Sequence, residues 1–77
     1  MPGEKTEIRN NIRRLRFEHG EMTQGELAER IGVTRQTVNA IEQGKYSPTL
    51  EAAFRIAQVF GRPLEEVFQY GPDEGQG

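Results

Sequence analysis

Side chains able to form paired hydrogen bonds gather in one short stretch of the sequence, residues 34–43. In the major groove of B-DNA, arginine can bond guanine, and glutamine or asparagine can bond adenine, through two hydrogen bonds at once. If this stretch is a helix that buries Val38 and Ile41, its polar side chains lie on the opposite face. The residues that then face outward are Arg35, Gln36, Asn39, Ala40 and Gln43. Base contacts are predicted for the first three of these.

Polar residues on either side of this stretch are placed to hold the DNA backbone. Gln24 would lie at the N-terminus of the preceding helix, where free backbone N–H groups and the helix dipole attract a phosphate. Arg13 and Arg14 could approach phosphates from the side, although a solvated charged surface is the simpler interpretation of the basic residues near them. Backbone contacts are expected from Gln24, Thr34, Thr37, Gln43, Lys45 and Tyr46.

Two short helices joined by a tight turn must position these side chains. The supporting helix is expected over about residues 24–31, where Thr23 and Glu26 have the spacing of a capping box. The recognition helix is expected over about residues 35–43, and Gly32 between the two helices permits a positive φ. These features predict a helix-turn-helix, and that frame favours base contact over an ordinary solvated helix face.

Around this pair the sequence predicts one all-α domain over residues 7–70. Five helices are expected, at about 7–19, 24–31, 35–43, 50–60 and 63–68, with no convincing strand. The buried side of the fourth helix is expected to carry Leu50, Phe54, Ala57 and Phe60. Short loops favour a compact bundle with neighbouring helices packed in pairs. Residues 1–6 are expected to be flexible, and residues 71–77 to form a disordered tail.

The order of apolar, small and capping residues is also specific as a whole. It runs Thr23-Gln24-x-x-Leu27-Ala28-x-x-Ile31-Gly32-Val33, then Thr34-x-x-Thr37-Val38-x-x-Ile41-Glu42-x-Gly44. This pattern resembles the Xre/Cro family of lambda-repressor-like DNA-binding domains, and the resemblance covers about residues 8–69. It implies a compact five-helix lambda-repressor-like bundle that places its third helix in the major groove of double-stranded operator DNA. Members are prokaryotic regulators that commonly act as homodimers, and a repressor is expected here.

The resemblance also implies roles for single residues. Gln24 corresponds to the residue that contacts a phosphate. The base-facing positions are held here by Arg35, Gln36, Asn39 and Ala40. Ala40 stands where a longer side chain can read a base, so less base information is available there. Arg16 and Glu42 fall where an arginine and a glutamate often pair, so a structural ion pair is expected between them.

Apolar residues near the end of the predicted bundle suggest an interaction surface. Val67, Phe68 and Tyr70 lie where a thin bundle has little left to cover them. Because exposed apolar clusters mark interaction sites, these residues are expected to form the interface of a homodimer. Such a dimer would be two-fold symmetric, and it would match an operator of the same symmetry.

Composition narrows the possible functions further. The 77 residues include no cysteine, one histidine (His19) and one serine (Ser47), which leaves no thiolate metal site and no obvious nucleophile–base pair. We therefore expect no enzymatic activity, no metal or other cofactor and no small-molecule ligand. No apolar run approaches a membrane span and no secretory signal is visible, so a cytoplasmic protein without membrane contact is expected.

The net charge of −2 is unevenly distributed along the chain. Residues 1–46 hold eight Lys and Arg against seven Asp and Glu, whereas residues 47–77 hold two against five. The acidity thus lies mainly away from the predicted DNA surface, and weak non-specific binding is expected. Two alternatives stay open. The antitoxin of a toxin–antitoxin pair is disfavoured by the short polar tail after Tyr70, and a protein-interaction module with the same fold is permitted by the acidic character.

Overall fold

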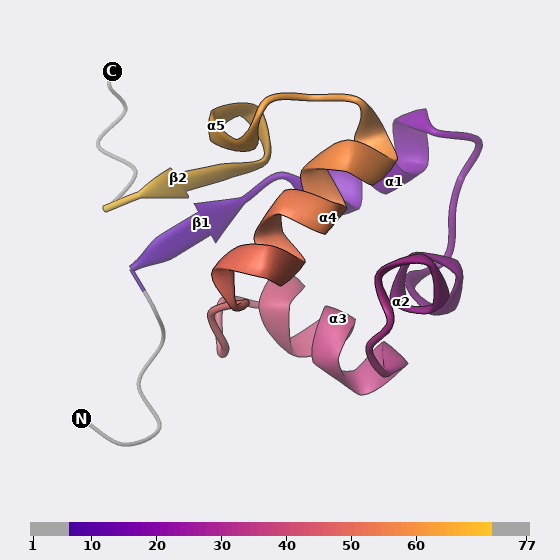
Figure 1. Ribbon diagram of the computed structural model, residues 1–77, viewed down its shortest axis with the longest axis horizontal. Coiled ribbons are helices and arrows are strands. Elements are labelled where there is room, and N and C mark those ends of the chain that lie inside the picture. The colour runs from indigo at the N-terminus through magenta and orange to yellow at the C-terminus, as the bar shows by residue number, and fades with distance from the viewer. Residues whose placement is uncertain (1–6, 72–77) are drawn as a thin grey trace.

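The computed structural model describes residues 7–71, whose elements are joined by short connections (Figure 1). In chain order they are β1 (Ile8–Asn10), α1 (Ile12–Glu18), α2 (Gln24–Ile31), α3 (Arg35–Glu42), α4 (Leu50–Phe60), α5 (Leu64–Val67) and β2 (Phe68–Tyr70). The prediction of a bundle with five helices is confirmed, and a two-stranded sheet is added to it. The expected flexible residues 1–6, and residues 72–77 of the tail expected over 71–77, lie outside the described residues. Gly71 is described, and it is held by hydrogen bonds to Glu7 and Arg9.

Threonine caps begin three of the helices. The hydroxyls of Thr23, Thr34 and Thr49 each accept a hydrogen bond from the backbone N–H three residues further on, at 3.0–3.1 Å. Glu26 completes a capping box, because its Oε1 accepts from the Thr23 N–H at 2.9 Å. Gly32 ends α2 with φ at +79°, a conformation that glycine adopts without strain. These local signals determine where the two helices of the helix-turn-helix begin and turn.

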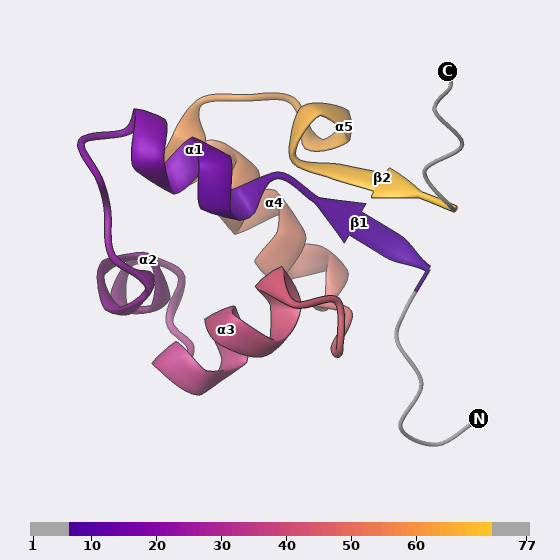
Figure 2. The ribbon, with the colours of Figure 1, turned by 180° about the vertical axis from the view of Figure 1, so that it is seen from behind.

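The core is made of apolar side chains from all five helices. Its buried members are Ile12, Leu15, Met22, Leu27, Ala28, Ile31, Val38, Ile41, Ile56, Ala57, Phe60 and Val67. Figures 1 and 2 show α4 passing through the middle of the molecule, with α2 and α3 on one side and α5 and the two strands on the other. Within residues 7–71 no polar or charged residue is fully buried, so apolar packing holds the bundle together. No helix in this range is long and apolar enough to cross a membrane.

The first helix begins later than the sequence predicts, at Ile12, and the prediction of no strand is wrong. Strands β1 and β2 pair antiparallel, with Ile8 opposite Tyr70 and Asn10 opposite Phe68. Each strand has three residues, which is too few to show an alternation of apolar and polar side chains. The partner of each strand is at the opposite end of the domain. Periodicity along the sequence therefore has no signal from which this pairing could be detected.

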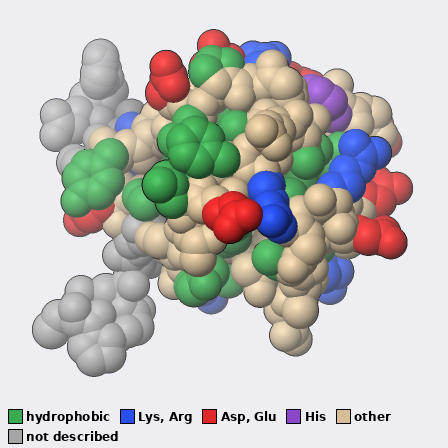
Figure 3. All heavy atoms as spheres, viewed as in Figure 1, with side chains coloured by type: hydrophobic (Ala, Val, Ile, Leu, Met, Phe, Trp, Pro, Cys, Tyr) green, Lys and Arg blue, Asp and Glu red, His purple; other side chains and the backbone are tan. Residues whose placement is uncertain are grey.

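The buried side of α4 differs from the predicted one. Leu50 and Phe54 are 68% and 49% exposed, so the prediction that they are buried is wrong. The buried residues are Ala53, Ile56, Ala57 and Phe60. The prediction assigned the buried face from the two large side chains. At the N-terminal end of α4 it is displaced by one residue from the observed buried face, which corresponds to a rotation of about 100° around the helix axis. Apolar side chains consequently gather on the surface that Figure 3 shows.

Candidate nucleic-acid interface

The face of α3 that the sequence predicts to contact bases is open to solvent. It carries Arg35, Gln36 and Asn39, which are exposed, and Ala40, which is half-buried. On the opposite side of the helix, Val38 and Ile41 are 1% and 2% exposed and belong to the core. The side chains of Arg35 and Gln36 form no hydrogen bond or ion pair within residues 7–71. Their donors and acceptors are therefore available to a ligand at the N-terminal end of α3.

The turn that orients α3 is supported from α4. Ala28 is 3% exposed, and its carbonyl accepts from the N–H groups of Gly32 and Val33 at 2.9 and 3.0 Å. Arg55 of α4 donates from Nη1 to the carbonyl of Ile31 at 3.3 Å, at the C-terminal end of α2. A larger residue at position 28 would separate the two helices, because this side chain lies inside the core. The turn thus holds α3 at a defined angle to α2.

An ion pair connects α1 to the C-terminal half of α3. Arg16 Nε lies 2.6 Å from Glu42 Oε2, and Arg16 Nη2 donates to Glu42 Oε1 at 3.1 Å. The two side chains are 15% and 8% exposed. Arg16 Nη1 also donates to the carbonyl of Met22 at 2.7 Å, which ties the loop before α2 to the same guanidinium. The pair is the one that the family resemblance implies, and it is a two-point contact of the strong kind.

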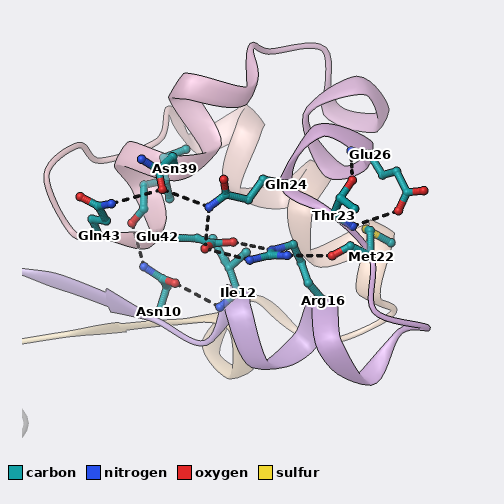
Figure 4. Close-up of polar contacts among 11 residues, drawn as sticks. Asn10, Ile12, Arg16, Met22, Thr23, Gln24, Glu26, Asn39, Glu42 and Gln43 are labelled. Carbon is teal, nitrogen blue, oxygen red and sulfur yellow. Dashed lines mark hydrogen bonds and ion pairs between the residues drawn. The ribbon is translucent and has the colours of Figure 1, made fainter.

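Three side-chain amides continue from this ion pair along the surface (Figure 4). Gln24 Nε2 donates to Glu42 Oε1 and to Asn39 Oδ1, both at 3.1 Å. Gln43 Nε2 donates to the same Asn39 oxygen at 3.2 Å. Both N–H bonds of the Gln24 amide are thus directed at protein acceptors. The predicted phosphate contact of this residue therefore depends on its backbone N–H, which lies in the first turn of α2.

A shallow polar hollow of about 340 Å³ lies between α1, α2 and α3. Its lining consists of Arg13, Arg16, Gln24, Asn39, Glu42 and Gln43. Arg13 is exposed there and makes no ion pair within the described residues, whereas Arg14 lies 3.7 Å from Glu18. Sequence reasoning treated Arg13 mainly as surface charge. The signal that could have distinguished it is its position one helical turn before Arg16, on the side of α1 that meets the recognition helix.

The other residues predicted to contact the DNA backbone lie at the two ends of α3. At its start, the hydroxyls of Thr34 and Thr37 are 2.9 Å apart, and the first also caps the helix. After its end, Lys45 and Tyr46 are exposed, and the Lys45 N–H bonds the carbonyl of Ala40 at 3.0 Å. These positions flank the exposed face of α3. Within residues 7–71 no group of His, Cys, Asp or Glu could hold a metal ion.

The predicted dimer residues do not share one environment. Val67 is 0% exposed and is part of the core, so it presents no surface to a partner, contrary to the prediction. Its side chain is buried because α5 packs this face against α4. Phe68 is partly buried against the core, and Tyr70 is 79% exposed. A groove of about 270 Å³ adjoins them, lined by Ile8, Pro48, Leu50, Ala53, Leu64 and Phe68.

Comparison with known proteins places this geometry among DNA-binding domains. A family model described as Helix-turn-helix matches residues 12–67. An uncharacterized HTH-type transcriptional regulator from Methanocaldococcus jannaschii is 46% identical over 67 residues, covering 87% of this chain and 100% of that protein. The cryptic phage CTXphi transcriptional repressor RstR from Vibrio cholerae is 40% identical over 58 residues, covering 75% of this chain and 51% of that protein. The crystal structure of a transcriptional regulator from Listeria innocua matches with a TM-score of 0.69 at 25% identity, covering 90% of this chain and 67% of that one.

Proposed function

The chain belongs to the Xre/Cro-like helix-turn-helix family, and on this premise we propose that it is a sequence-specific transcriptional repressor that binds double-stranded DNA as a homodimer. In this function α3 enters the major groove with its N-terminal end, and α2 crosses the DNA backbone. The activity is binding without catalysis. Because it requires chromosomal DNA, we assign it to the cytoplasm of a prokaryotic cell.

The observation that carries the proposal is the exposed polar face of α3 on a rigid frame. Arg35 and Gln36 have unused hydrogen-bonding groups, while the opposite face of the helix is buried. Side chains of these types form paired bonds to guanine and adenine. Repression in particular is supported by the likeness to RstR, whose name describes a transcriptional repressor.

The electrostatics of the surface fit DNA in spite of the acidic composition. Glu42 is the acidic residue of α3, and Arg16 compensates its charge at 2.6 Å. Arg13 beside the polar hollow, Arg35 at the start of α3 and Lys45 after its end add positive charges without acidic partners in the described residues. We expect few phosphate contacts, and hence a modest contribution from counterion release. Specific base contacts and dimerisation then supply a larger share of the affinity.

The exposed apolar surface supports the dimer. Leu50, Phe54 and Tyr70 are 68%, 49% and 79% exposed, and the groove beside β1 and α4 lies next to them. A monomeric domain of this size rarely exposes so many large apolar side chains together. A two-fold axis through this surface would pair it with itself and leave α3 of each copy free.

In vitro selection of bound DNA tests the proposal. We expect a two-fold symmetric site whose half-sites are about 34 Å apart, or one helical turn. Arg35→Ala should weaken binding to that site by roughly ten- to a hundredfold and change binding to random DNA much less. A reporter gene with the site across its promoter should lose transcription when the protein is present. Failure to select any sequence, even at low salt, would contradict DNA binding and favour the protein-interaction module instead.

A further inference from the structure

We propose that Asn39 contacts its base pair as a hydrogen-bond donor, and that Gln24 sets this polarity through the ion pair of Arg16 and Glu42. The inference rests on the proposed function, since it concerns the same contact of α3 with DNA. It names a positioning residue, Gln24, and the chemical class of base-edge atom that Asn39 reads. That class is an acceptor: N7 or O6 of guanine, N7 of adenine, or O4 of thymine.

The polarity starts at Glu42, because a carboxylate accepts hydrogen bonds and donates none. Both of its oxygens bond Arg16, from Nε at 2.6 Å and from Nη2 at 3.1 Å, so the carboxylate cannot turn away. Only 8% of the Glu42 side chain is exposed. The group that faces Glu42 Oε1 from α2 must therefore be a donor.

Gln24 supplies that donor, and its orientation follows from the charge. Its Nε2 lies 3.1 Å from Glu42 Oε1, whereas an amide turned over would bring its oxygen against the carboxylate. The second hydrogen of the same nitrogen is directed at Asn39, at 3.1 Å. Asn39 must consequently present its oxygen to Gln24.

Asn39 is then fixed as well. Its Oδ1 accepts from Gln24 and from Gln43, at 3.1 and 3.2 Å, which occupies both lone pairs of that oxygen. Its Nδ2 donates to no group within residues 7–71, and Figure 4 shows this nitrogen on the side away from Gln24. The paired contact to adenine that asparagine usually makes needs a free oxygen as well as a free N–H group. In this chain only the donor is free.

The test first locates the base pair and then removes single groove atoms from it. Selection with the wild-type protein and with Asn39→Ala identifies the base pair whose preference depends on Asn39. Duplexes are then made in which that pair lacks an acceptor, such as N7 in a 7-deazapurine, or lacks an exocyclic amino donor. Removing the acceptor should weaken wild-type binding by roughly ten- to a hundredfold, and removing the amino group should leave it unchanged.

Gln24→Met tests the positioning role. Methionine keeps the length of the side chain and removes both donors. The side-chain amides of Asn39 and Gln43 are then free to rotate by half a turn, which would direct the Asn39 oxygen toward the DNA. At the base pair that Asn39 contacts, the variant should no longer distinguish duplexes that lack the acceptor from duplexes that lack the amino donor. Its preference at the base pairs contacted by Arg35 should remain. A merely structural effect would weaken binding at all positions alike. Gln58→Met, the same change at an exposed site on α4, is the matched control and should alter nothing.

Two results would overturn the inference. The first is a loss of wild-type affinity when the amino donor is removed, since Asn39 would then be accepting a hydrogen bond. The second is an unchanged base preference in Asn39→Ala or in Gln24→Met. Failure of the wild-type protein to select any sequence is a different outcome, which contradicts the proposed function itself.

Discussion

Glu42 places a negative charge on α3, the helix proposed to enter the groove, and its contact with Arg16 keeps that charge from opposing DNA. The contact also joins α1, α2 and α3, because the same guanidinium reaches the carbonyl of Met22. A buried pair of this kind is not in itself a large source of stability, since both charges lose water. Removing one partner is costly, however, because the other is left buried without compensation.

We predict that Glu42→Ala lowers the free energy of unfolding by about 3–5 kcal/mol. Arg16 is 15% exposed and would lose its two bonds to the carboxylate. Urea unfolding followed by circular dichroism measures the change. Glu29→Ala on the exposed side of α2 is the control and should stay within about 0.5 kcal/mol of the wild type. An equal, small shift in both variants would show that the pair contributes little.

Arg13 is the residue for which the structure adds most to the sequence. It borders the polar hollow beside Gln24 and Asn39 and has no acidic partner in the described residues. We predict that Arg13→Ala weakens binding about equally on cognate and random DNA and lowers the salt slope by about one unit. Binding titrations over a range of salt concentrations measure both. Arg62→Ala, in the loop before α5, should leave the slope unchanged, and an unchanged slope in Arg13→Ala would exclude a phosphate contact.

The sequence predicted the residue types of the interface better than their contacts. The exposure of Arg35 and Gln36 follows from their spacing relative to Val38 and Ile41. The bonds of Gln24 do not follow from any spacing, because they depend on where α1, α2 and α3 meet in space. Family resemblance suggested the Arg16–Glu42 pair, yet the amide contacts that continue from it are visible only in the folded chain.

At the scale of elements, the sequence predicted the helix starts, which depend on neighbouring residues. It did not predict the features that depend on contacts between distant residues. Thr23, Thr34 and Thr49 mark their helix starts because a hydroxyl satisfies the same chain's N–H a few residues away. Strands β1 and β2 pair across the whole domain, so their contact leaves no local pattern. The same limit explains α4, where the large side chains Leu50 and Phe54 suggested the wrong buried face.

Asn10 connects the missed ribbon to the recognition helix. Its Nδ2 donates to the carbonyl of Ile41 at 2.9 Å, and its Oδ1 accepts from the N–H of Ile12 at 3.1 Å. Its side chain therefore satisfies the first N–H of α1 and also ties β1 to the last turn of α3. This double contact gives the ribbon a direct influence on the position of α3.

We predict that Asn10→Ala lowers the free energy of unfolding by about 1–3 kcal/mol, because a half-buried carbonyl and an N–H group lose their partner. Hydrogen exchange should show earlier opening of the amides of β1 and of Asn11, whose N–H bonds Val67. Gln58→Ala, at an exposed site on α4 outside the ribbon, is the control. Equal protection and equal stability in the two variants would contradict the proposed coupling.

At the scale of the whole molecule, DNA binding and dimerisation are proposed for two different surfaces. The exposed face of α3 carries side chains suited to bases, and the apolar surface of Leu50, Phe54 and Tyr70 beside the groove carries none of them. A small domain has a thin core, so covering such a surface with a second copy adds stability and also supplies a second recognition helix. Affinity for a two-fold site would then depend on protein concentration through the dimer equilibrium.

The double variant Leu50→Ser, Tyr70→Ser separates these two surfaces. Both side chains are largely exposed, so the folded monomer should lose little stability, whereas a dimer that buries them should dissociate. Sedimentation equilibrium at micromolar concentration should give twice the 8.7 kDa chain mass for the wild type and the single mass for the variant. The variant should bind a half-site about as well as the wild type and lose the additional affinity for the two-fold site.

Phe17→Ser is the control for this experiment. It removes an aromatic ring that is 68% exposed on α1, outside the groove, and the variant should stay dimeric. A wild-type protein that sediments as a monomer, even with the two-fold site present, would contradict the proposed dimer.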